Sequence, residues 1–304
     1  MQKTSRSCHG LGAKVRLTVY HEDAAYAADS MERALTQIER IEKVMSLYRK
    51  DGQLTRLNTD GYLENADPGL LEVLSYAQNL SEQTSGAFDV TVQPLWLAYR
   101  KASWEGRLPS PAEIETARGA VDWRRIKIED STVSFTSPKT QVSLNGIAQG
   151  YAADRVAAAL RADGICHALI DTGEIHSVGG KRENLPWRVG IQHPRKRSAV
   201  LERASLENRC LSTSGDYESR FSQDFSSHHI FRPASGESPR ELASVSVVAP
   251  TALEADALST ACMVMGAELS TQFIESRPNV DAFIVKKTGE KIQTSGFPKY
   301  LTIS

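Results

Sequence analysis

Residues 141–164 read QVSLNGIAQGYAADRVAAALRADG, a stretch that combines three kinds of local structure. Gln141–Leu144 predicts a short strand, and Tyr151–Ala162 predicts a helix that Gly164 ends. Asn145–Gly150 lies between them as a turn that opens onto the helix. Backbone N–H groups at such a helix start bind phosphate well, and glycine lets the phosphate approach closely. The same order is also ordinary chain connectivity, because the stretch is neither G-x-G-x-x-G nor a Walker sequence, so both interpretations stay open.

A strand and two helices are expected before this stretch. Gly12–His21 alternates apolar and polar side chains, which is the period of a half-buried strand. From Asp23 to about Ser46, apolar residues recur every three or four positions and predict a long amphipathic helix. A loop is expected over Tyr48–Asn58. A second helix starts at Asp67-Pro68, where a capping residue precedes a proline at the first helical position.

Short strands are expected in the middle of the chain. Turn residues separate Arg125–Ile128, Thr132–Phe135 and Gln141–Leu144, which together predict an antiparallel meander. Cys166–Ile170 predicts a further strand, and Thr251–Met265 predicts a helix with a capping signature at its start. The chain is therefore expected to be α+β, with two lobes folded as a single unit of helices packed on antiparallel or mixed sheets.

The composition excludes several classes of protein. The 304 residues are 40% hydrophobic and 24% charged, which is typical of a globular domain and unlike a disordered chain. Lys and Arg number 36 and Asp and Glu 37, giving a net charge of −1, so no nucleic-acid partner is expected. No apolar run approaches the length of a membrane span. The four cysteines have neither zinc-site spacing nor the pattern of a disulfide framework.

The segment ALEADALST, residues 252–260, carries the first candidate site. Asp256 and Thr260 lie four positions apart near a helix start, so both side chains share one face. A carboxylate and a hydroxyl suit a hard cation such as Mg²⁺, which prefers oxygen ligands. The alternative is that an acidic residue simply stabilises the first turns through the helix dipole. Spacing alone favours this alternative.

Two further segments hold candidate residues. His228 and His229 are adjacent, so on a strand they point to opposite faces and only one can join a given site. A histidine near neutral pKa can take a proton from a hydroxyl nucleophile, although a solvated strand end is the simpler explanation. Ser85–Asp89 ends a helix with small residues that let the chain pass a flat or bulky group. A helix stop followed by a buried Phe88 explains this segment equally well.

Six ordered segments resemble the ApbE-like family, the FAD:protein FMN transferases that attach FMN to proteins through a phosphoester bond. They cover most of the chain from about residue 11 to 270. The forms LNGIAQG and DTGEI lack the glycine pairs of many relatives and look more like the NosX-type branch, associated with nitrous oxide reductase maturation. The segments are MSLYRKDGQLTRLN, TSGAFDVTVQPLW, VSLNGIAQGYAADRV, TSGDYESRF, HHIFRPASG and ASVSVVAPTALEADALSTACMVMG.

The resemblance implies a single ApbE-like flavin transferase domain over residues 11–304, after a short segment 1–10, with FAD in a cleft between the lobes. It implies a Mg²⁺ site formed by Asp256, Thr260 and the backbone carbonyl of Ala148. It also implies that His229 is the base that prepares the acceptor hydroxyl. The positions that match the FAD-binding residues of the family are Leu11, Tyr48, Ala87, Phe88, Asp89, Asn145 and Ile230, with Asp154 as a further candidate.

The implied reaction is Mg²⁺-dependent transfer of FMN from FAD to a Ser or Thr of a partner flavoprotein. The acceptor hydroxyl attacks the FMN-side phosphorus and AMP leaves, while Mg²⁺ offsets charge on the pyrophosphate oxygens. Arg232 stands where the family usually has Asp before the proline. This difference motivates an alternative, a non-catalytic protein that binds and delivers FAD. A third hypothesis is an FAD pyrophosphatase that uses water as the acceptor.

The resemblance also implies a partner and a compartment. The expected acceptor is a membrane electron-transfer subunit, by analogy with the family alone. Members of this type mostly work outside the cytoplasm, so a periplasmic location is expected. Residues 1–10 lack the apolar centre of a signal peptide, so a cytoplasmic location stays open.

Overall fold

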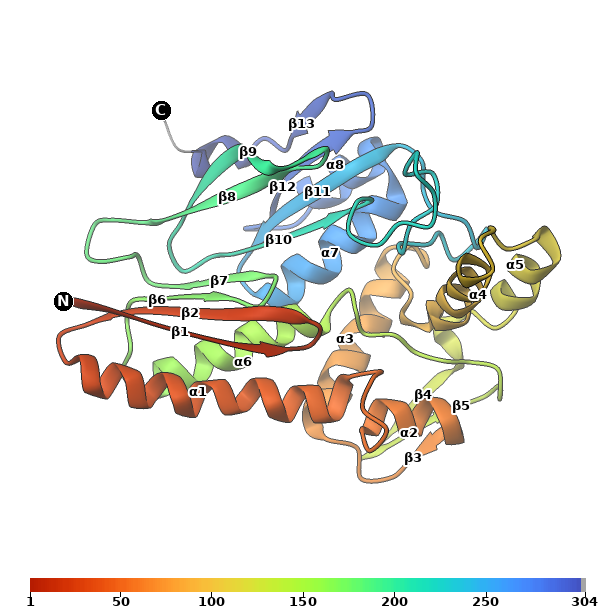
Figure 1. Cartoon of the computed structure of the whole chain (residues 1–304), viewed down its shortest axis with the longest axis horizontal. Coiled ribbons are helices and arrows are strands. Elements are labelled where there is room, and N and C mark those ends of the chain that lie inside the picture. The colour runs from red at the N-terminus through yellow and green to blue at the C-terminus, as the bar shows by residue number, and fades with distance from the viewer. Residues whose placement is uncertain (302–304) are drawn as a thin grey trace.

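The computed structural model describes residues 1–301, and its central element is an eight-stranded sheet (Figure 1). The strand order is β1-β2-β6-β7-β10-β11-β12-β13, and every neighbouring pair is antiparallel. This sheet and its helices confirm the α+β class. The strands are β1 (Gln2–Gly10), β2 (Ala13–His21), β6 (Ala168–Asp171), β7 (Ile175–Val178), β10 (Cys210–Gly215), β11 (Leu242–Ala249), β12 (Asp281–Lys286) and β13 (Lys291–Gln293).

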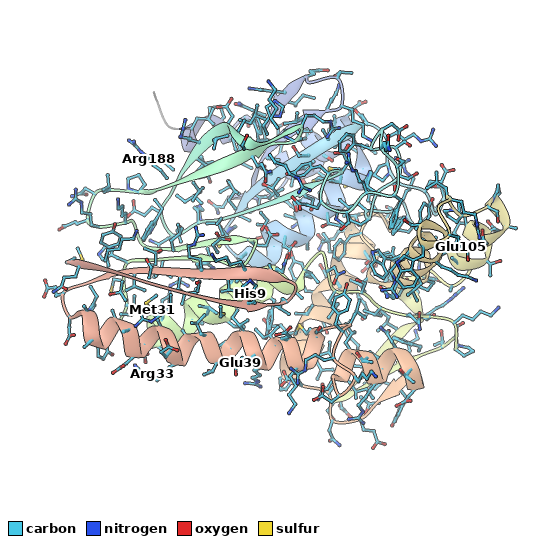
Figure 2. All side chains as sticks on the ribbon, in the orientation of Figure 1. His9, Met31, Arg33, Glu39, Glu105 and Arg188 are labelled. Atoms are coloured by element: carbon cyan, nitrogen blue, oxygen red, sulfur yellow. The ribbon has the colours of Figure 1, made fainter. Side chains whose placement is uncertain are left out.

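Helices cover one face of the large sheet. Helix α1 packs against α6 and β1, and α7 packs against α6, β10 and β11. Figure 2 shows the two sides of α1: Met31 is fully buried beneath the sheet, whereas Arg33 and Glu39 lie on the exposed side. The amphipathic period seen in the sequence thus places the apolar stripe of α1 in the main core. The helices are α1 (Ala24–Met45), α6 (Ala148–Ala162), α7 (Ala252–Met265) and α8 (Ala267–Glu275).

A two-stranded ribbon packs against the opposite face of the sheet. Strands β8 (Trp187–His193) and β9 (Lys196–Leu206) pair with each other. Their inward side chains form a second apolar cluster with residues of β10, β11 and β12, including Leu211, Val248 and Phe283. Because these side chains alternate with those facing α7, the sheet is buried on both faces in this region.

The other lobe contains a small sheet and four helices. Its strands follow the order β3-β5-β4, again antiparallel. Apolar residues of α2 and α3 join the main core, whereas α4 and α5 pack on each other at one end of the molecule (Figure 1). The elements are α2 (Gln53–Asp60), α3 (Pro68–Gln83), α4 (Gln93–Trp104), α5 (Pro111–Arg118), β3 (Tyr62–Leu63), β4 (Ile126–Glu129) and β5 (Thr132–Phe135).

The predicted helix starts are confirmed by their capping bonds. Asp23 accepts hydrogen bonds from two backbone N–H groups in the first turn of α1, and Asp67 accepts one in the first turn of α3. Thr251 caps α7 by accepting the N–H of Glu254. Side-chain oxygens thus satisfy donors that have no partner within the helix. The strand predicted at Thr132–Phe135 is β5, with identical bounds.

The strand predicted at Gln141–Leu144 is wrong. This segment runs as irregular chain, and its backbone bonds to single groups instead of to a strand. The Asn58 side chain donates to the Val142 carbonyl at 2.8 Å and accepts the Val142 N–H at 2.7 Å. The Ser143 N–H donates to the Val90 carbonyl. One side-chain amide therefore replaces the strand partner, and the edge of β5 pairs with β3 instead.

Three other boundaries differ from the sequence prediction. The expected loop Tyr48–Asn58 contains the start of α2, which buries only Leu54 and Leu57 and has no side-chain cap. Helix α6 begins at Ala148 and not at Tyr151, because the turn itself already has helical geometry. The segment 1–10, expected to precede the domain, contributes β1 to the large sheet.

Among residues 1–301, no helix combines the length and apolar character that crossing a membrane requires.

Candidate functional site

The starts of α6 and α7 meet at Gly150 and Asp256. Asp256 is buried, and its Oδ2 accepts a hydrogen bond from the Gly150 N–H at 3.0 Å. A Cβ at Gly150 would lie 2.2 Å from the Ala252 carbonyl oxygen. A contact this short is impossible for a real side chain, so only glycine lets the two helices approach so closely.

Thr260 lies one helical turn after Asp256 and faces the turn before α6. Its Oγ1 is 3.1 Å from the Ser214 Oγ of β10. A Cβ at Gly146 would lie 2.8 Å from the Thr260 Oγ1. Ala148 stands between the two glycines that touch Asp256 and Thr260. The structure therefore brings the turn that contains Ala148 next to Asp256 and Thr260, whereas a contact of the Ala148 carbonyl itself stays a prediction.

The electrostatics at Asp256 favour a bound cation. Burial raises the pKa of Asp256 well above its ordinary range, and the carboxylates of Glu174 and Asp154 raise it further. A buried carboxylate beside other acidic groups is costly when ionised, and a divalent cation offsets that cost. The available donors are carboxylate, hydroxyl and backbone carbonyl oxygens, which suit Mg²⁺. These residues fit the ion, although its binding stays a prediction.

Glu174 is a buried acid at this site that the sequence reasoning missed. It lies in the turn between β6 and β7, and its side-chain Oε2 has no hydrogen-bond partner within residues 1–301. Burial raises its pKa to about 7. The one sequence signal is the glutamate of DTGEI, which by itself indicates only a departure from the glycine pair of many relatives.

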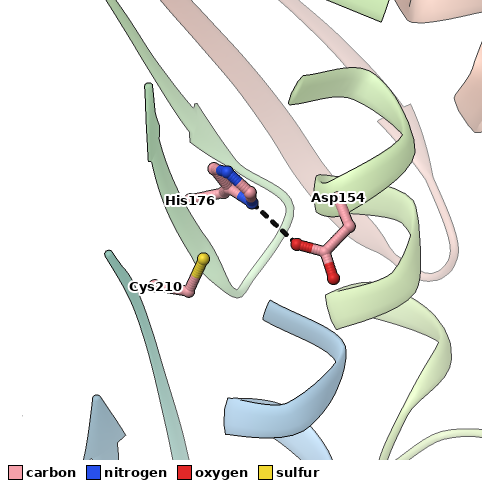
Figure 3. Close-up of side chains that lie close together, drawn as sticks. All are labelled: Asp154, His176 and Cys210. Atoms are coloured by element: carbon pink, nitrogen blue, oxygen red, sulfur yellow. Dashed lines mark hydrogen bonds and ion pairs between the residues drawn. The ribbon is translucent and has the colours of Figure 1, made fainter. Parts of the chain in front are cut away.

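Asp154 connects α6 to the start of α7. Its two carboxylate oxygens accept the Ala252 and Leu253 N–H groups at 2.8 and 2.9 Å. The His176 Nδ1 donates to Oδ1 at 2.7 Å, with Cys210 close by (Figure 3). These bonds stabilise the N-terminus of α7 and account for the carboxylate. Proximity of the three side chains therefore does not indicate a second metal centre, and contact of Asp154 with FAD stays a prediction.

A cavity of about 330 Å³ lies between α2, α4 and the segment before α6. Two predicted FAD positions, Tyr48 and Asn145, line it. Tyr48 is 70% exposed, so its ring is accessible for stacking. Trp96 and Arg100 also line the cavity, with the Arg100 guanidinium 4.3 Å from the Trp96 ring centroid. Aromatic faces and a cation suit a planar, anionic ligand.

The predicted FAD positions that follow α3, residues 87–89, mostly make contacts that stabilise the fold. Phe88 is buried in the main core, and Ala87 packs against it. The Asp89 carboxylate accepts the Thr91 N–H at 2.7 Å and the Trp123 N–H at 3.1 Å. Burial raises the pKa of Asp89 to about 6. Asp89 thus holds two loops together, and a role of these three residues in FAD binding stays a prediction.

Leu11 and Ile230, two further predicted FAD positions, lie in two different loops. Leu11 lies in the β1–β2 turn with φ of 53°, and its carbonyl accepts a bond from the Gln149 side chain of α6 at 3.3 Å. Ile230 is buried in the loop between β10 and β11, beside His229. Leu11 thus lies next to the start of α6, and contact of Leu11 or Ile230 with FAD stays a prediction.

His229 is held as a neutral base. Its Nδ1 donates to the Ser219 carbonyl at 3.2 Å, which fixes the tautomer and leaves Nε2 as the basic nitrogen. Burial lowers the pKa of His229 below the ordinary value of 6.5. Its neighbour His228 is fully buried, with Nε2 donating to the Pro239 carbonyl and Nδ1 accepting the Ile230 N–H at 3.4 Å. Of the adjacent pair, only His229 therefore has a nitrogen suited to accept a proton.

Arg232, the departure from the family pattern, serves the fold. Its guanidinium donates to the Val264 carbonyl at 3.3 Å, in the last turn of α7. A cation at this end of a helix is favourable, because the last carbonyls lack partners within the helix. The residue that motivates a non-catalytic protein thus has an independent structural explanation.

Comparison with known proteins shows the family of the chain. A family model described as the ApbE family matches residues 11–284. The chain belongs to the ApbE family. The matched residues include both helices of the Asp256 site and the loop that carries His229. The narrower NosX-type assignment stays a prediction.

Named relatives and solved structures of ApbE proteins cover nearly the whole chain. The FAD:protein FMN transferase of Salmonella typhimurium is 30% identical, covering 96% of this chain and 87% of the relative. That of Vibrio cholerae is 32% identical, covering 88% and 80%. The ApbE protein of Thermotoga maritima superposes with a TM-score of 0.89 at 28% identity, covering 99% and 100%. The Pseudomonas stutzeri flavinyl transferase ApbE gives 0.85 at 27% identity, covering 100% and 98%.

Proposed function

We propose that this ApbE protein transfers FMN from FAD to a Ser or Thr hydroxyl of a partner flavoprotein, releasing AMP with the help of Mg²⁺. The observation that carries the proposal is that Gly146 and Gly150, on either side of Ala148, contact Thr260 and Asp256 where α6 crosses α7. The relatives named FAD:protein FMN transferase support the same reaction. FAD is a substrate in this scheme and leaves as two products.

The side chains divide the work between holding charge and moving a proton. The Asp256 carboxylate, the Thr260 hydroxyl and the Ala148 carbonyl would hold Mg²⁺, which supplies neutralisation of pyrophosphate charge. The N–H groups at the start of α6 would bind phosphate oxygens. His229 Nε2 takes the proton from the Ser or Thr hydroxyl of the partner protein as the oxygen of that hydroxyl bonds to the FMN-side phosphorus. The bond from this phosphorus to the AMP oxygen breaks.

The partner and compartment follow from the family rather than from the site. We propose a membrane electron-transfer flavoprotein as the acceptor and the periplasm as the place of reaction. The DTGEI form supports a NosX-type role in maturation. Mass spectrometry of periplasmic and membrane fractions, comparing cells with and without this protein, would identify the flavinylated Ser or Thr.

Mass spectrometry of an acceptor domain also tests the reaction itself. The domain is incubated with this protein, FAD and Mg²⁺, beside a sample with chelator, and AMP is measured in parallel. We expect a gain of one FMN on a Ser or Thr with matching AMP, both lost with chelator. AMP without an adduct would identify a pyrophosphatase. Bound FAD with neither product, for a domain that another transferase does modify, would identify a delivery protein.

His229→Ala should lower kcat for transfer at least 100-fold while FAD affinity changes little, since a positioned base contributes about 10² to 10⁴. The pKa of His229 lies below 6.5 because of burial, so the base stays neutral as the pH falls through that value. The acid limb of kcat/KM should therefore lie below pH 6.5. An unchanged kcat, or an acid limb above pH 6.5, would remove His229 from this role.

A further inference from the structure

Strand register places Glu174 next to a second buried oxygen, that of Ser212. Strands β7 and β10 are antiparallel, with Ile175 opposite Leu211. One step further along the same register, Glu174 lies opposite Ser212. Side chains directly opposite in such a pair point to the same face of the sheet. The two side chains therefore lie side by side.

The shared face is the one that α7 covers. Ser214 is two residues after Ser212 in β10, so both point to the same side. The Ser214 Oγ contacts Ser259 and Thr260 of α7 at 2.8 and 3.1 Å. Among the neighbouring charges, Glu174 raises the pKa of Asp256 most. Glu174 and Ser212 thus face the same part of α7 as the Asp256 site.

Both of these buried oxygens lack a well-formed hydrogen bond. Ser212 and the Thr213 N–H lie close enough to Glu174 to lower its pKa through hydrogen bonding. Within residues 1–301, however, neither Glu174 Oε2 nor Ser212 Oγ has a well-formed hydrogen bond, although Glu174 is only 8% exposed and Ser212 only 1%. A buried polar atom left unpaired is costly, and proteins rarely keep two side by side without a function. Two such oxygens on the sheet face that α7 covers, one of them on a carboxylate that acts on Asp256, indicate a ligand that both would contact.

We propose that Glu174, with Ser212 beside it, is an additional acidic group of the cation site, so that this chain binds a divalent cation before FAD arrives. The inference rests on the cation site of the proposed function. Asp256 alone leaves a divalent cation with a net charge of +1, which substrate phosphate would have to neutralise. A second carboxylate neutralises the ion within the protein. The number of charged ligands is a main determinant of affinity for hard cations.

Titration of the full chain with Mn²⁺ in the absence of FAD tests this proposal, with free Mn²⁺ followed by electron paramagnetic resonance. Glu174→Gln keeps the shape of the side chain and removes its charge. We expect the Kd for Mn²⁺ to rise at least 10-fold. The matched control is Asp171→Asn. Asp171 is a nearby carboxylate that raises the pKa of Glu174, but its Oδ1 accepts the Gly173 N–H. We expect less than a threefold change in this control.

Two further variants separate the possible outcomes. If Asp256→Asn abolishes Mn²⁺ binding but Glu174→Gln leaves Kd within twofold of wild type, the cation site stands and the role of Glu174 is overturned. If Asp256→Asn leaves Kd unchanged, the cation site of the proposed function is itself wrong. Equal effects of Glu174→Gln and Asp171→Asn would reduce Glu174 to a distant charge and overturn the proposal. Should Glu174→Gln not fold, Ser212→Ala decides, with a threefold rise in Kd expected and no change overturning the inference.

Discussion

Asp256→Asn should lower FMN transfer about a thousand-fold while the protein stays folded, because loss of a charge-stabilising group at such a site costs about 10² to 10³ in rate or more. The amide oxygen can still accept the Gly150 N–H that now bonds to Asp256 Oδ2 at 3.0 Å. Burial and neighbouring acids disfavour the ionised Asp256 in the metal-free protein. The variant should therefore unfold at the same temperature as wild type, or higher, without metal.

The measurement is the initial rate of FMN adduct formation by mass spectrometry at saturating Mg²⁺, with thermal unfolding of both proteins. Asp171→Asn removes one carboxylate at the end of β6, which is not among the predicted cation ligands, and serves as the control. Its rate should stay within a few-fold of wild type. A variant at Asp256 that transfers FMN at the wild-type rate would show that this carboxylate holds no cation needed for the reaction.

Gly150→Ala should lower the free energy of unfolding by about 3 kcal/mol, at the upper end of the usual cost of overpacking. The added methyl group would meet backbone atoms of Ala252, the nearest at 2.2 Å, and the Asp256 Cβ at 2.8 Å. Backbone cannot rotate away as a flexible side chain would, so α6 and α7 must separate. Urea unfolding followed by circular dichroism measures the loss of stability.

Gly119→Ala is the matched control for this change. Gly119 ends α5 with φ of −58°, and an added Cβ would have its nearest neighbours at 3.5 Å. We expect a change of at most about 0.5 kcal/mol there, as for most surface substitutions. If Gly150→Ala were equally harmless, the close crossing of α6 and α7 would not be needed for stability. Separation of the helices should also lower transfer activity, since Asp256 moves with α7.

Local sequence signals were sufficient where one side chain determines one element. The helix starts could be predicted from Asp23, Asp67 and Thr251, because a capping oxygen bonds to N–H groups within its own turn. The spacing of Asp256 and Thr260 placed them on one face of a helix for the same reason. By contrast, β3 has two residues, too few for any period. The bonding of Val142 to Asn58 joins positions 84 residues apart, which no local pattern encodes.

The candidate site shows the same division. Glu174 gives no signal of its own, because its position opposite Ser212 depends on the register of β7 and β10. The work of Arg232 at the end of α7 and of Asp154 at its start also depends on contacts between distant segments. Sequence patterns could therefore identify the residues of the candidate cation site. The environment of each carboxylate, by contrast, depends on the fold.

The candidate oxygen donors and most of the cavity lining come from different lobes, which meet at Asn145 in the cavity wall beside Gly146. Asp256, Thr260 and Glu174 sit on or beside the large sheet, whereas α2 and α4 line the cavity around Tyr48. Under the proposed function, we expect substitutions in α2 and α4 to change which acceptor or which part of the dinucleotide is bound, while the carboxylates of Asp256 and Glu174 stay unchanged. Chimaeras that exchange residues 48–118 between relatives would be the natural way to swap target choice while preserving chemistry.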